Sequence, residues 1–443
     1  MKIKFLRRAV FLSQMSILLF ASSTHAQLNT TFERLFNHIL HEDLFTDAFN
    51  GGNFAKAAAE ANQSLTPALN TLIATNVSSF PLASTIAGIN FVRSSSSRAP
   101  EMVVESLGPI FAETAKTIGR GRINCGLTYA YYNLSRFRGL ATEDLRFTIL
   151  SQDLSGDGTI GDIPIENETI DLFPDLNIQA HTVVLFTTLG ITKNFDIGMA
   201  APFINLNLSG TAKAVINSTS FFDFGAAFNN FNNDPANPDL VDYYAYDESY
   251  LGLGDLALRL KYSFLQDATV DLAAFVDVRF PTGEQEGFLG TGKANARFSW
   301  IVSKKSGNFS PHLNLGYDRR GLKADSDELE FIIGFDQKLT RAITFALDFL
   351  GEYELNHTGI TFPGTKTIIS QIEKNNLPPA RREMELDLTN IPANDQDHVL
   401  NASIGFRMAP SESFSGFANI ILPMNDGGLR SGIAPTFGLA VSF

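Results

Sequence analysis

The final eight residues of the chain, TFGLAVSF, alternate between two kinds of side chain. Phe437, Leu439, Val441 and Phe443 fall on one face, whereas Thr436 and the other intervening residues are small or polar. A period of two with one apolar and one polar face predicts a β-strand that lies between two different solvents. Because an edge strand of a water-soluble sandwich can also alternate in this way, the preceding strands must identify those solvents.

The same alternation recurs from about residue 120 onward, in runs separated by connections that are alternately long and short. Twelve strands joined in this rhythm are typical of an antiparallel transmembrane β-barrel, with short periplasmic turns and long outer loops. The predicted strands lie near 120–134, 174–191, 195–217, 250–265, 269–282, 293–304, 309–319, 327–339, 342–356, 397–409, 413–424 and 433–443. The predicted long connections lie near 135–173, 218–249, 283–292, 320–326, 357–396 and 425–432.

Charged residues in these strands fall on the face opposite the large apolar residues, as Arg259 and Lys261 do beside Leu258 and Leu260. A lipid-facing Arg or Lys near the bilayer midplane costs about 2–4 kcal/mol, so we expect the charges to face a lumen. We expect Arg279 and Arg407 to hold the carboxylate head group of a solute. The candidates for the lumen and solute path are Arg259, Lys261, Arg279, Arg297, Arg407, Asp277, Glu330 and Asp336.

The fold class that we predict is therefore all-β, a closed antiparallel barrel of about 12 strands. After the N-terminal segment no 18 consecutive residues are apolar, which excludes inner-membrane helices. The alternative is a β-sandwich with one wet face. A sandwich does not explain the regular loop rhythm or the 38 Phe residues, which suit a lipid-facing surface.

Residues 1–26 have the features of a cleaved secretory signal, with a basic start, a short apolar stretch and small residues before Gln27. Removing its four positive charges takes the formal net charge from -13 to -17, which disfavours nucleic-acid binding. The single cysteine, Cys125, excludes an intramolecular disulfide framework. We expect an outer-membrane protein of a Gram-negative-type bacterium.

Residues 27–119 differ from the strands that follow. Phe32, Leu35, Phe36 and Ile39 follow helical spacing, which predicts a helix near the start of the mature chain. The segment is too apolar for a disordered tail. Two arrangements remain open: a plug within the lumen of the barrel formed by 120–443, or a helical cap at its periplasmic mouth.

Several stretches resemble a family of bacterial outer-membrane transporters named for the meta-pathway of phenol degradation, similar in outline to long-chain fatty acid transporter channels. The resemblance implies a transport barrel and does not identify a solute. The residues that carry it are 107–129 (LGPIFAETAKTIGRGRINCGLTY), 185–212, 251–265 (LGLGDLALRLKYSFL), 276–298 and 310–317.

One loop offers a candidate metal site. Asp153, Ser155, Asp157 and Thr159 place oxygen side chains at alternate positions, as at the start of a calcium loop. The twelfth position is Pro164 instead of a bidentate Glu, so a solvated turn is the alternative. We expect no other cofactor.

We expect a channel for the passive passage of small, hydrophobic compounds, and no enzymatic activity. None of His181, His312 and His398 forms the His-x-Ser pair of an outer-membrane phospholipase. The alternative is a non-conducting structural or adhesive barrel that acts through its long loops. Expected partners are outer-membrane lipid, a small-molecule solute, periplasmic chaperones and the barrel-assembly machinery, which would recognise Phe443 as an assembly signal.

Overall fold

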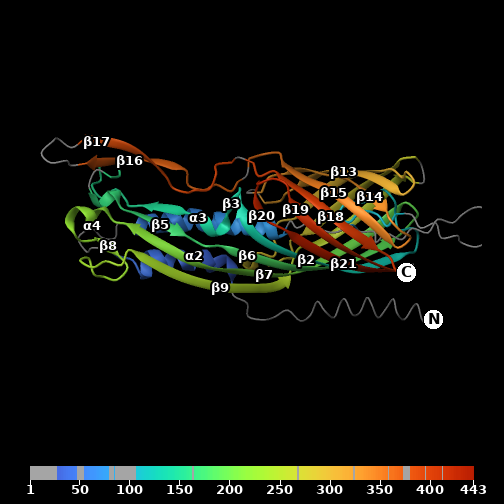
Figure 1. The fold of residues 1–443 in the computed structure, drawn as a ribbon, viewed down its shortest axis with the longest axis horizontal. Coiled ribbons are helices and arrows are strands. Elements are labelled where there is room, and N and C mark those ends of the chain that lie inside the picture. The colour runs from blue at the N-terminus through green and yellow to red at the C-terminus, as the bar shows by residue number, and fades with distance from the viewer. Residues whose placement is uncertain are drawn as a thin grey trace, which may run out of the picture.

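The computed structural model describes residues 27–46, 54–78, 84, 106–161, 164–266, 269–322, 325–357, 359–372, 380–394, 396–411 and 413–443. The predicted signal at 1–26 lies outside the described residues. The main feature is a closed antiparallel barrel of twelve strand positions (Figure 1). Around the ring these are β2 (Ile123–Phe137), β6 (Asn177–Gly190), β7 (Phe195–Asn217), β9 (Val241–Leu253) with β10 (Leu256–Leu265), β11 (Asp271–Phe280), β12 (Asn295–Ser303), β13 (Phe309–Arg319), β14 (Glu328–Lys338), β15 (Ile343–Glu354), β18 (Val399–Met408), β19 (Phe414–Pro423) and β21 (Ala434–Ser442).

The ring closes where β21 pairs with β2, from Asn124 opposite Ser442 to Ala130 opposite Thr436. Beyond the last strand, the N–H of Phe443 donates to the carbonyl of Ile123 over 2.9 Å, and the reverse bond measures 3.1 Å. The closure therefore includes Phe443, and the predicted barrel of twelve strands is confirmed.

The fourth strand position differs from the prediction of a single strand over 250–265. It begins at Val241 as β9, breaks after Leu253 and resumes at Leu256 as β10. Both pieces pair with β7, and β10 also pairs with β11. Residues 241–249, predicted as loop, are therefore strand.

The two faces of the strands have the predicted environments. On β10, Arg259 and Lys261 are 4% and 2% exposed, whereas Tyr262 and Phe264 are 47% and 53% exposed. Large apolar side chains cover the outside of the ring, and the charges point inwards. An apolar outer band of this kind is what a bilayer requires of a barrel.

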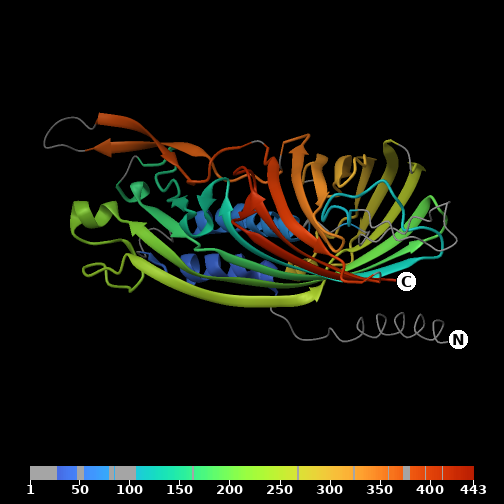
Figure 2. The same cartoon turned by 45° about the vertical axis from the view of Figure 1, so that its right-hand side comes forward.

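The two ends of the barrel differ. Short turns close one end, which we call the short-turn end, and the strands β2, β6, β7 and β9 extend beyond the other, the long-loop end (Figure 2). The connections at the long-loop end contain further structure that the sequence did not predict. They hold β3 (Leu140–Ala141), β4 (Phe147–Leu150), β5 (Thr169–Phe173), α4 (Thr219–Phe224), β8 (Asn229–Asn230), β20 (Leu429–Ser431) and a hairpin of β16 (Thr365–Ile372) and β17 (Ala380–Asp387).

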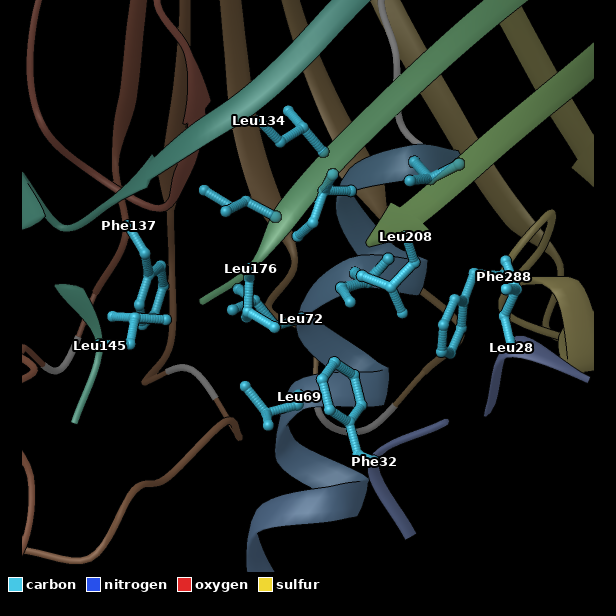
Figure 3. Packing of buried hydrophobic residues seen from close by; sticks show 14 of the residues in the cluster. Leu28, Phe32, Leu69, Leu72, Leu134, Phe137, Leu145, Leu176, Leu208 and Phe288 are labelled. Carbon is cyan, nitrogen blue, oxygen red and sulfur yellow. The ribbon is translucent and has the colours of Figure 1, made fainter. Parts of the chain in front are cut away.

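The N-terminal helices lie at the long-loop end of the barrel, away from the short-turn mouth at which a cap was the alternative (Figure 1). They are η1 (Leu28–Thr30), α2 (Thr31–Asn37), η2 (His38–Glu42) and α3 (Ala55–Ser78). Their apolar faces pack against the inner face of the extended strands, where Phe32 and Leu69 lie near Leu208 (Figure 3). In the described part of the chain, no helix is long and apolar enough to cross a membrane.

Candidate functional site: the barrel lumen

Residues 107–118, here called the strap, cross the barrel at its short-turn end without regular secondary structure. At one end of the strap the N–H of Leu107 donates to Oγ1 of Thr344 on β15, over 3.1 Å. At the other end the N–H of Ile118 donates to Oδ2 of Asp196 on β7, over 2.9 Å. Because β15 and β7 occupy opposite positions in the ring of twelve, the strap spans the lumen from wall to wall.

The middle of the strap is held by a buried ion pair between the carboxylate of Glu113 and Nζ of Lys261 on β10. The backbone of Glu113 is fixed as well. In the amide orientation that satisfies both groups, Asn314 donates to the Glu113 carbonyl over 3.0 Å and accepts from its N–H over 2.7 Å. We call the Glu113–Lys261 pair the latch. Removing one partner of a buried pair leaves an uncompensated charge, so the latch favours the closed position of the strap.

The two arginines predicted to hold a solute head group contact the N-terminal segment in this structure, and solute binding stays a prediction. Arg407 donates from Nη2 to the carbonyl of Pro109 in the strap over 2.7 Å. Arg279 donates from Nη1 to the carbonyl of Ser78, the last residue of α3, over 2.7 Å. Both guanidinium groups therefore bind backbone carbonyls of the N-terminal segment.

Four other candidates form one network along the wall. Asp277 on β11 accepts from Arg259 over 3.1 Å and lies 3.4 Å from Arg297, and Arg297 pairs with Glu330 over 2.5 Å. The cross-strand register brings them together, since Asp277 lies opposite Arg259 on one side and Arg297 on the other. The two positive and two negative charges balance one another and line the wall as a neutralised strip.

The eighth candidate, Asp336, belongs to a cluster that the sequence analysis missed. His312 on β13 lies between two carboxylates, with Nε2 2.6 Å from Asp348 and Nδ1 3.6 Å from Asp336. All three side chains are buried. The alternation of side chains along β13 places His312 on the inward face, and this was the signal available in the sequence. Its partner Asp348 lies on another strand, 36 residues further along the chain.

A cavity of about 60 Å³ lies beside the strap, between the neutralised strip and apolar side chains. Arg279, Arg297 and Glu330 line one part of it. Another part is apolar, with Phe111 of the strap and, from the wall, Phe275, Ile332 and Leu350. The remaining lining is mostly polar or charged, with Ser299, Asn314, Asp318, Arg320 and Glu352. The cavity therefore combines a small apolar surface with fixed charges of both signs.

Near this cavity Asp318, Glu328 and Glu330 bring carboxylate oxygens within 4.8 Å of one another. Arg320 pairs with Asp318 over 3.0 Å and with Glu328 over 2.5 Å. Arg297 pairs with Glu330. The guanidinium groups thus supply the positive charge that these carboxylates require.

The calcium-loop candidates lie in an exposed turn at the long-loop end. Asp153 accepts from the N–H groups of Gly156 and Gly158 over 2.6 and 2.8 Å, and the bond from Gly158 leads the causes that lower its pKa. Asp157 accepts from the N–H of Thr159 over 2.8 Å, and Ser155 Oγ lies 3.2 Å from Asp153 Oδ1. The side chains stabilise the turn itself, and calcium binding stays a prediction.

No family model and no curated protein sequence matches the chain. Among solved structures, an outer membrane channel from Pseudomonas putida F1 aligns with 74% of this chain and 98% of its own, at 9% identity and a TM-score of 0.41. A FadL homologue from Pseudomonas aeruginosa aligns with 82% and 98%, at 9% identity and 0.34. The NanC porin aligns with 60% and 93%, at 8% identity and 0.32. Similarity this limited does not establish a shared activity, and the resemblance to the phenol-degradation transporters stays a prediction.

Proposed function

We propose that the protein is a passive channel of a bacterial outer membrane, closed by its strap and open to small, mostly apolar compounds when the strap moves. The apolar outer band supports the membrane location, because a water-soluble barrel would expose polar residues on its outside. The observation that carries the channel assignment is the strap, which crosses the lumen from β15 to β7.

The lining of the lumen supports the solute class. Phe275, Ile332 and Leu350 offer apolar contact, while Arg279 and Arg297 line the same cavity. A compound with an apolar body and one acidic group fits such a surface, because the body is removed from water and the acid meets a guanidinium group. Arg407 would become available to a second acid once Pro109 leaves it.

The second candidate is a non-conducting barrel that presents its long connections as a scaffold or adhesin. The projecting hairpin of β16 and β17 favours it, since a channel has no need of such a structure (Figure 1). In either case we propose that lipid surrounds the outer band. We also propose that periplasmic chaperones deliver the chain and that the assembly machinery recognises Phe443.

Swelling of liposomes that contain the protein tests the channel assignment. We expect swelling with aromatic acids and short fatty acids, and little with sugars of the same mass, because only apolar bodies gain from the lumen lining. The variant Glu113→Gln should swell faster than the wild type with the same acids. Swelling that is absent for every solute in both proteins would support the scaffold.

A further inference from the structure

The outer face of the extended strands changes character along one level that crosses four strands. Cross-strand register places four residues at this level: Tyr131, His181, Asn205 and Leu251. One step towards the short-turn end, the outward residues are Tyr129, Val183, Phe203 and Leu253. One step towards the long-loop end, they are Asn133, Gln179, Asn207 and Ser249. This boundary level therefore marks the limit of the apolar band on β2, β6, β7 and β9. Residues on its long-loop side are described below as lying above it.

A groove of about 590 Å³ opens on the same strands just above this level. Its volume lies within the range of small-molecule sites, roughly 300–1,000 Å³. Amides, hydroxyls and carboxylates dominate its lining, among them Asn133, Ser135, Asn177, Ser209, Thr211 and Asp247. The floor is rigid, because Tyr246 donates to the carbonyl of Pro174 over 2.8 Å and Asp175 accepts from the N–H of Thr211 over 2.9 Å.

This lining fits a ligand that both donates and accepts many hydrogen bonds. An Asn side chain offers two donors and an acceptor, a Ser or Thr hydroxyl offers both, and a carboxylate only accepts. No Lys or Arg side chain is among the described residues that line the groove, so the lining has no partner for a phosphate or carboxylate. Neutral sugar hydroxyls meet all of these requirements.

We propose that the groove binds the sugar chain of an outer-leaflet glycolipid. The inference rests on the proposed membrane location, and its geometric support is the height of the groove. Asn177, Ser209 and Asp247 share one level, which lies four residues beyond the boundary level. At about 3.3 Å per residue this is roughly 13 Å along the strands, and a strand tilt of about 35–45° reduces it to a height of roughly 10 Å. That height exceeds the thickness of the interfacial zone, roughly 5–8 Å on each side of the hydrocarbon core. The groove thus opens sideways at the height of the sugars on neighbouring lipids.

The test uses the full-length protein in nanodiscs that carry either lipopolysaccharide with its core sugars or lipid A without them. Native mass spectrometry should show retention of the first lipid and little of the second. The variants Asn177→Ala and Asp247→Ala should each weaken retention about tenfold, as expected for loss of a hydrogen bond to a sugar. The control Asn205→Ala, on the same face and outside the groove, should retain the lipid like the wild type.

Equal retention of lipid A would overturn the proposal, and so would equal losses for Asn205→Ala and Asn177→Ala. Competition with maltotriose tests whether the groove instead binds a free saccharide. If maltotriose displaces the glycolipid at micromolar concentration, the ligand is a soluble sugar and the glycolipid assignment fails. Retention does not depend on conductance. If the wild type retains lipopolysaccharide through its core sugars but the strap variants never conduct, the glycolipid site is supported and the channel assignment is refuted.

Discussion

Replacing Glu113 with Gln should raise the ion conductance of the barrel by on the order of a hundredfold. The substitution leaves Lys261 buried without its partner only while the strap is closed, which costs about 3 kcal/mol, the low end for a broken buried pair. The low end is appropriate because Asp196 also lies close enough to interact with Lys261. Single-channel recording in planar bilayers measures the effect as open probability.

Two further variants make this result specific to the strap. Asp397→Asn breaks the pair between Arg138 and Asp397, whose 2.9 Å contact is about as buried but does not touch the strap. Its conductance should equal that of the wild type. The double variant Glu113→Gln with Lys261→Met also removes the unpaired charge of Lys261. Its conductance should therefore fall back most of the way to that of the wild type. An open Asp397→Asn channel would mean that any loss of stability opens the lumen.

Introducing Arg at Met199 should lower the free energy of unfolding by about 2–4 kcal/mol, the cost of a charge near the bilayer midplane. Met199 lies on the outward face of β7 at the middle of its apolar stretch, from Phe195 to Phe203, and is 59% exposed. A side chain with that exposure would tolerate Arg in water, because surface substitutions usually change stability by less than about 0.5 kcal/mol. Urea unfolding in lipid vesicles, followed by Trp300 fluorescence, gives the value.

The matched control is Asn207→Arg, on the same strand and the same face, in the polar region above the band. We expect it to change the free energy of unfolding by less than about 1 kcal/mol, as found for charges near the interface. If Met199→Arg does not fold, Met199→Gln gives a smaller loss in the same direction. Equal effects at residues 199 and 207 would show that the apolar band does not face lipid.

The barrel could be predicted from the sequence because each membrane strand alternates apolar side chains that face outwards with polar side chains that face the lumen. Arg259 and Lys261 were placed inwards on that basis, and they are buried in the structure. The prediction failed at β9 because that strand rises above the apolar band. Its outward Asp247 and Ser249 are polar and its inward Tyr246 and Tyr250 pack on protein, so a lipid-facing pattern is missing.

The site was less predictable, because its contacts join residues far apart in the chain. Glu113 and Lys261 are separated by 148 residues, and only the fold brings them together. The alternation of side chains along β11 and β18 placed Arg279 and Arg407 on the inner face. Alternation does not identify the groups that lie opposite them across the lumen. The structure shows that these groups are the carbonyls of Ser78 and Pro109.

Cross-linking the strap to the wall tests the central claim most directly. Ala115 donates from its N–H to Oγ of Ser303 over 3.3 Å, so cysteines at these two positions, in a Cys125→Ser background, lie close enough to be joined. Combined with Glu113→Gln, the oxidised protein should not conduct, and reduction should restore the conductance of Glu113→Gln alone. Equal conductance before and after reduction, with the disulfide verified by mass spectrometry, would contradict closure of the lumen by residues 107–118.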